Sequence, residues 1–176
     1  MKLIAPALLL LLAVPAASQT SMQASALKGL DTGAPIDVDA ARIEIQDASN
    51  QAIFTGAVVI RQGRLTLNAD TVKILYTRVG DAPEMQRLDA RGRVKLVSPS
   101  ETATANTAIY DVRGKLITMS GNVVLNRGGS VLNGQRLVLD LASGRTSFDS
   151  RAGATTPGSS GRVTGRFLVP QRTEQK

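Results

Sequence analysis

The sequence predicts an all-β protein in which short antiparallel strands stack into a single domain. Two observations lead to this fold class. Apolar residues alternate with polar ones through the middle of the chain, as is typical of strands that bury one face. A pattern of glycine and small residues also returns there every 29 to 36 residues, and repeats of that length are typical of stacked supersecondary units.

The N-terminus has the features of a signal for export. Lys2 precedes an apolar run over residues 3–14, and small residues follow it. The run has 12 residues, fewer than the roughly 20 that a membrane-spanning helix needs. We therefore expect a cleaved signal peptide at 1–17, a flexible segment at 18–34 and a periplasmic location. A retained signal would instead act as an anchor.

Three copies of one motif organise residues 35–150, which we expect to form one domain. In each copy, a glycine is followed by apolar residues two and four places later and by a small residue 13 places later. The glycines are Gly56, Gly92 and Gly121, and the small residues are Ala69, Ala105 and Gly134, with an earlier equivalent at Ala40. The small residues are therefore 29, 36 and 29 positions apart, and the longer interval predicts an enlarged turn at 78–83.

The expected strands bend where the repeat has its small residues. Ile36, Val38 and Ala40 alternate, and the inward phase then slips by one residue before Ile43. Because a strand must bulge to keep one face inward across such a slip, we expect corners at Ala40 and at its equivalents, where a small side chain leaves room. Turns are expected at 47–50, 113–114 and 143–144, where Asn and Gly accept the required backbone angles.

The end of the chain is expected to lie outside the domain. Residues 151–161 are rich in Gly, Ser and Thr, which predicts a flexible linker. Residues 166–169 are expected to form either a last weak strand or a docking segment, within a tail that ends at residue 176.

The residues that share the inward phase are almost all apolar. They are Ile36, Val38, Ile43, Ile45, Phe54, Val58, Ile60, Leu65, Leu67, Val72, Ile74, Tyr76, Val94, Leu96, Met119, Val123, Leu125, Leu132, Leu137, Leu139 and Phe148. Glu101 is the exception in this phase; it aligns with Leu65 and predicts a rim or corner. Such an array forms either a dry core or the lining of a groove that suits acyl chains, and the residues alone leave both alternatives open.

Composition excludes several classes of function. The chain has no Cys and no His, which removes thiol nucleophiles, Ser-His-Asp triads and the usual zinc sites. Acidic residues such as Asp37, Glu44 and Asp140 fall in the outward phase, so a glycosidase pair of carboxylates is not expected. Aromatic residues make up 3% of the chain, too few to stack nucleic acid bases. We expect no enzymatic activity, no metal and no cofactor.

The excess of basic residues favours anionic partners in the cell envelope. The formal net charge is +7. Two pairs of arginines flank expected turns or corners, and we take them as candidates for phosphate contacts at the rim of a groove. They are Arg61 and Arg64, and Arg91 and Arg93.

Several phrases resemble, in the same order, those of the OstA-like domain family of LptA-type lipopolysaccharide-transport proteins. They are PIDVDAARIEI at 35–45, AIFTGAVVIRQG at 52–63, LTLNAD at 65–70, AIYD at 108–111 and GNVVL at 121–125. The resemblance covers about 35–148 and includes the signal peptide.

The resemblance implies a slightly twisted β-jellyroll, open at both ends, that associates head to tail. It implies a protein that receives lipopolysaccharide from an LptC-like inner-membrane protein. The acyl chains of lipid A would be shielded in the groove and passed to an LptD-like outer-membrane protein. Two alternatives stay open: an LptC-like subunit anchored in the inner membrane, and a structural β-solenoid of the envelope, such as an adhesin, with a dry core.

Overall fold

The computed structural model describes residues 31–80, 82–150 and 162–167. In these residues the chain forms one antiparallel sheet of 10 strands. The strands are β1 (Ile36–Asp39), β2 (Arg42–Gln46), β3 (Gln51–Gln62), β4 (Leu65–Val79), β5 (Ala82–Val97), β6 (Glu101–Asp111), β7 (Leu116–Arg127), β8 (Ser130–Asp140), β9 (Thr146–Asp149) and β10 (Thr164–Arg166). A 3-10 helix, η1 (Asp47–Ser49), joins β2 to β3. The predicted all-β class is confirmed.

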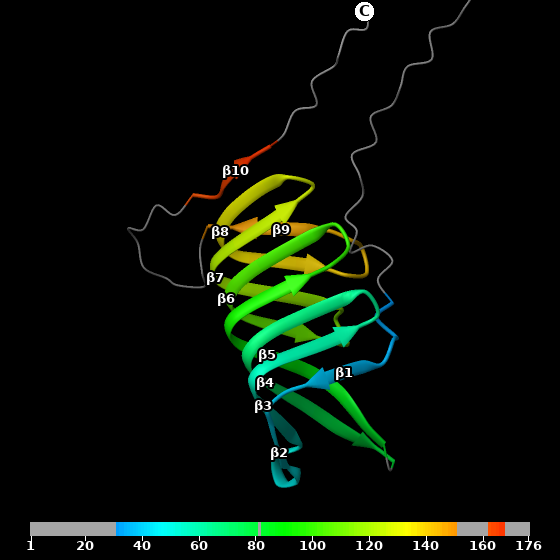
Figure 1. Ribbon diagram of the computed structural model, residues 1–176. Helices are drawn as coiled ribbons and strands as arrows, with labels where there is room; N and C mark the ends of the chain where they lie inside the picture. The colour runs from blue at the N-terminus through cyan, green and yellow to red at the C-terminus, as the bar shows by residue number, and fades with distance from the viewer. Residues whose placement is uncertain (1–30, 81, 151–161, 168–176) are drawn as a thin grey trace, which may run out of the picture.

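The strands form a stack that does not close on itself. From β3 to β8, strands that follow each other in the chain are neighbours in the sheet. At one end β1 and β2 both pair with β3, and at the other end β9 and β10 both pair with β8. Figure 1 shows these two pairs at opposite ends of the stack. In the described part of the chain, each end therefore presents strand edges without a partner strand.

A bulge near the middle of the long strands bends the sheet. The register shifts in every pairing from β3 to β8. Gly56, Gly92 and Gly121 begin the bulges with φ of +87°, +75° and +82°. A side chain at Gly56 would place its Cβ 2.7 Å from the Cβ of Ala41, so this position needs glycine both for its backbone angle and for space.

The strand register explains why the repeat has a constant spacing. Two residues after each of these glycines, a valine lies directly opposite the small residue of the motif. The pairs are Val58 with Ala69, Val94 with Ala105, and Val123 with Gly134. The predicted corners are therefore confirmed, and each bulge divides a strand of 11 to 16 residues into two short segments.

The bulges divide the sheet into two walls that face each other. The first wall consists of β1, β10 and residues 58–62, 65–69, 94–97, 101–105, 123–127 and 130–134; the second consists of β2, β9 and residues 51–55, 71–79, 82–91, 107–111, 116–120 and 136–140. Inward side chains of both walls form one apolar core, in which Val72, Met119 and Leu137 are fully buried. The walls meet at the bulges, so the trough between them has its mouth on the opposite side, between the hairpin ends of the strands.

The turns follow the predictions with one correction. Asn50 and Gly144 have φ of +48° and +71°, as expected for residues that close turns. The enlarged turn expected at 78–83 is wrong, because β4 and β5 stay paired as far as Val79 and Ala82. The additional residues lengthen this hairpin, whose tip projects from the stack in Figure 1.

The last weak strand lies slightly earlier than expected. Thr164–Arg166 forms β10 and pairs with 131–133 of β8, in the first wall. The signal peptide at 1–17, most of the segment at 18–34, the linker at 151–161 and the tail from residue 168 onward lie outside the described residues. Within the described ranges, no helix is long and apolar enough to cross a membrane.

Candidate functional site

A hollow opens beside β2 on the inner face of the second wall. Its volume is about 650 Å³. The residues that line it are Ile45, Asp47, Ala52, Phe54, Ile74, Tyr76, Arg78, Gly80, Pro83 and Met85. Ile74 belongs both to this lining and to the core between the walls. The apolar surface of the hollow is therefore continuous with the interior of the trough.

The β2 end of the trough leaves large apolar side chains uncovered. Ile43 and Ile45 are 54% and 62% exposed, although they lie on the same face of the sheet as Phe54 and Ala52, their partners on β3. At the edge of the hollow, the Tyr76 hydroxyl donates a hydrogen bond of 3.2 Å to Asp47 Oδ1. An apolar hollow with a few polar groups at its edge is the usual composition of a ligand site.

The structure brings the predicted groove residues together on the facing sides of the two walls. Those buried in the core are Val58, Ile60, Leu65, Leu67, Val72, Ile74, Val94, Leu96, Met119, Val123, Leu125, Leu137 and Leu139. Those partly buried are Ile36, Val38, Phe54, Tyr76, Leu132 and Phe148. Ile43 and Ile45, on the terminal strand of the second wall, are the two exposed members of the predicted set. That these residues bind lipid stays a prediction.

Sequence reasoning missed part of the second wall. Leu88, Ala90 and Ile117 are buried in the same core. A signal was present, because the residues two and four positions before Gly92 and Gly121 share the inward phase, and all of them are buried in the core. The charged neighbours of Leu88 concealed this alternation in β5. Tyr110 was also missed, although it lies in the core at 6% exposure.

Polar side chains in the inward phase gather at the mouth of the trough. Glu101, with 4% of its side chain exposed, is held by Arg127, whose Nε lies 2.8 Å from Glu101 Oε1. Arg127 also donates a hydrogen bond of 2.8 Å to the hydroxyl of Thr146. Since Arg127 belongs to the first wall and Thr146 to the second, this contact links the walls across the mouth. The rim position expected for Glu101 is thus observed.

The four candidate arginines are all exposed, but they do not form one cluster. Arg61 and Arg91 alternate with buried residues and point away from the core. Arg93 is already paired, with its Nε 2.9 Å from Asp70 Oδ1. This hydrogen bond holds the pKa of Asp70 below its usual value and raises the pKa of Arg93. Their contact with phosphate stays a prediction.

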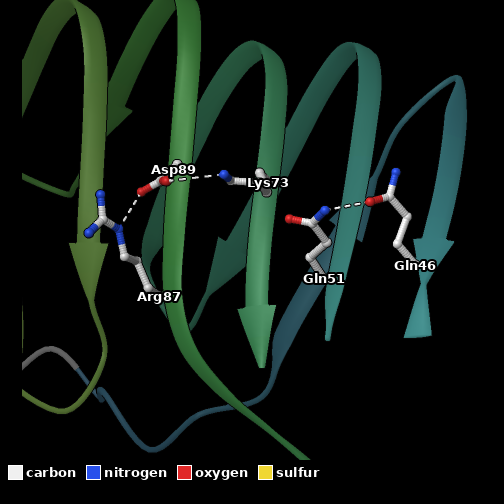
Figure 2. A network of polar contacts seen from close by, with 5 residues as sticks. All are labelled: Gln46, Gln51, Lys73, Arg87 and Asp89. Carbon is white, nitrogen blue, oxygen red and sulfur yellow. Dashed lines mark hydrogen bonds and ion pairs between the residues drawn. The ribbon is translucent and has the colours of Figure 1, made fainter. Parts of the chain in front are cut away.

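The outer face of the second wall carries polar contacts between neighbouring strands. Figure 2 shows Gln51 donating to Gln46, and Asp89 between Lys73 and Arg87, across neighbouring strands. The Arg87 Nε lies 2.6 Å from Asp89 Oδ1, and the Lys73 Nζ lies 4.0 Å from Asp89 Oδ2. Nowhere in the described ranges do three or more acidic side chains gather as metal ligands. The continuous apolar cluster lies on the inner face.

Comparison with protein families shows to which family the chain belongs. The family described as LptA/(LptD N-terminal domain) LPS transport protein matches residues 37–145. The chain belongs to this family. The LptA-type resemblance expected from the sequence is thereby confirmed, and the matched range lies within the two-walled domain.

One of two similar proteins carries the LptA name. The lipopolysaccharide export system protein LptA of Escherichia coli (strain K12) is 26% identical over 163 residues, covering 89% of this chain and 82% of that protein. An uncharacterised protein of Rhizobium meliloti (strain 1021) is 29% identical over 143 residues, covering 78% of this chain and 76% of that protein.

The fold of this LptA-type chain also matches a solved structure. The crystal structure of LptH from Pseudomonas aeruginosa, described as the LptA homologous periplasmic component of the lipopolysaccharide transport device, superposes with a TM-score of 0.69. The match has 19% identity and covers 80% of this chain and 99% of that one. At this identity the similarity concerns the fold, and it supports the β-jellyroll that was expected.

Proposed function

We propose that this LptA-type protein is exported to the periplasm and binds lipopolysaccharide, with the acyl chains of lipid A against the inner faces of the two walls. The observation that carries the proposal is the apolar surface that runs from the core into the hollow beside β2. The family supports it, since its members are described as lipopolysaccharide-transport proteins.

The hydrophobic effect favours burial of acyl chains between the two walls. Each methylene removed from water contributes about 0.8 kcal/mol, so a chain of about 12 carbons gains roughly 10 kcal/mol from burial. A lipid with several such chains does not cross an aqueous compartment unaided. In our proposal the hollow receives the first chain segment, and the walls part along the mouth to admit the rest.

We further propose that the protein bridges the two membranes by head-to-tail association, between an LptC-like donor in the inner membrane and an LptD-like acceptor in the outer membrane. The β1–β2 end and the β9–β10 end of the stack have different strand edges. Unlike ends that pair form a contact that repeats without closing, which gives a filament.

Association predicts a mass that grows with concentration. Light scattering on the mature protein should show an average mass that rises steadily from micromolar to millimolar concentration. Truncation after Ser150 removes β10 from the edge of β8 and should shift this curve, because one of the two edges at that end changes. A wild-type mass that stays at the monomer value throughout would contradict the filament.

A structural β-solenoid with a dry core is the second candidate, and the tight packing between the walls favours it. Binding distinguishes the two functions. Calorimetric titration of the mature protein with lipopolysaccharide dispersed in mild detergent should give saturable binding if the protein is a carrier. A dry scaffold would give no more heat than the detergent blank.

A further inference from the structure

One hydroxyl group in the core finds no acceptor for its proton among the described residues. Tyr110 is 6% exposed, and in the described part of the chain its O–H meets no hydrogen-bond acceptor in suitable geometry. Burial raises the pKa of Tyr110, and a hydrogen bond from the Gln62 side chain to the phenolic oxygen offsets part of this effect. The hydroxyl therefore keeps its proton at neutral pH and is available as a donor. Buried polar groups without partners are uncommon and call for an explanation.

The hydroxyl lies where the two walls face each other near the mouth. Tyr110 from the second wall and Gln62 from the first line the same small cavity, with a volume of about 30 Å³. The remaining lining is apolar and includes Leu65 and Leu88. Ile36 of β1 and Ile117 of β7 line it too, so the cavity lies within the stack and not at either of its ends.

The other polar groups at the mouth are already engaged. The Gln62 amide donates to the carbonyl oxygens of Thr32 and Ala34, at 3.0 and 3.2 Å. Glu101 is paired with Arg127. Tyr110 therefore differs from them, because a ligand can accept its hydrogen bond without breaking either of these contacts.

The chemistry of an acyl chain supplies a suitable partner. The methylene groups of the chain cannot accept a hydrogen bond, and a purely aliphatic ligand would leave the hydroxyl unpaired. Every acyl chain ends in a carbonyl where it joins its head group through an ester or amide. A carbonyl oxygen is a good acceptor for a phenolic O–H, and the bond is favoured in an apolar surrounding.

We propose that the Tyr110 hydroxyl recognises the ester or amide carbonyl that links an acyl chain to its head group. The inference rests on the proposed function and adds a specificity element to it. In this arrangement the chain lies between the walls, the carbonyl lies beside Tyr110 at the mouth, and the polar head group stays outside. Tyr110 thus sets how deeply the lipid inserts and favours acyl over alkyl chains.

Two lipid probes that differ in this carbonyl test the proposal. A diacyl phosphatidylglycerol and its dialkyl ether analogue have the same head group and chain length, and either can displace an apolar fluorophore from the protein. The wild-type protein should bind the diacyl probe about fivefold more tightly, the effect of one neutral hydrogen bond. Tyr110→Phe should abolish this preference. Thr118→Val, which removes a hydroxyl on the outer face of the second wall, should leave it unchanged.

A stability measurement separates recognition from a structural role. Tyr110→Phe should leave the urea unfolding midpoint of the lipid-free protein unchanged or slightly higher, because it removes a buried O–H that donates to no acceptor. A clearly lower midpoint would overturn the proposal, since it would mean that the hydroxyl is already bonded in the free protein.

The other possible results of the probe experiment also overturn either the inference or the proposed function. Equal affinity of the wild-type protein for both probes overturns the inference, whereas the proposed function stands if lipopolysaccharide still binds. A preference for the diacyl probe that survives in Tyr110→Phe also overturns it, because another group then recognises the carbonyl. Failure to bind either probe or lipopolysaccharide overturns the proposed function itself.

Discussion

Replacing Arg127 by Met should lower the free energy of unfolding by about 3 kcal/mol. The Glu101 carboxylate, 4% exposed, would lose its ion pair and remain among the apolar residues Leu96, Ala103 and Leu125. The loss of one partner of a buried pair is costly because the other charge stays desolvated. Urea unfolding followed by circular dichroism measures this loss.

Two comparisons show whether the buried charge is the cause. Arg113→Met removes an exposed partner 3.9 Å from Glu84, and it should change stability by less than about 0.5 kcal/mol. The double variant Glu101→Leu/Arg127→Met replaces the pair by apolar side chains and restores at position 101 the residue type of its repeat equivalent, Leu65. It should recover most of the lost stability. A double variant as unstable as Arg127→Met would contradict this explanation.

Phe54→Asp should weaken lipopolysaccharide binding at least about thirtyfold, equal to about 2 kcal/mol. Phe54 lines the hollow and is partly buried, so an aspartate there can stay hydrated in the free protein. When acyl chains cover it, the charge loses its water without gaining a partner. Calorimetric titration of the variant against the wild-type protein measures the difference.

The matched control for this variant is Ile53→Asp on the same strand. Ile53 is also partly buried, but it neighbours Phe54 in the alternating pattern and lies on the outer face opposite Lys73. Its replacement should leave binding within about threefold of wild type. An equal loss of affinity in both variants would mean that the inner face is not the binding surface.

The repeat in the sequence was sufficient to predict the class of fold and its corners. The register of two strands in a hairpin depends on residues that are close together in the chain. The motif glycines and small residues therefore indicate it, as the pairs Val58 with Ala69 and Val94 with Ala105 show. The bulge also has a local cause, since Gly56 needs a left-handed backbone angle and an open position beside Ala41.

Contacts between the walls could not be predicted in the same way. The link from Arg127 to Thr146 and the approach of Gln62 to Tyr110 join segments that no periodicity relates. The hollow depends on the length of the β4–β5 hairpin, which was expected to be an enlarged turn. The position of β10 on the edge of β8 depends on a tail that the repeat does not include.

Photo-crosslinking of neighbouring residues in cells that make lipopolysaccharide tests the central claim most directly. A photoreactive amino acid would replace Phe54 or Leu125 on the inner faces, and Ile53 or Val124 as their outward neighbours. Leu125 is 1% exposed and Val124 is 37% exposed, so accessibility to water alone favours labelling at Val124. We predict that lipopolysaccharide is captured at Phe54 and Leu125 and not at Ile53 or Val124. Capture mainly from the outward positions would show that the lipid travels on the outside of the protein and would contradict the account.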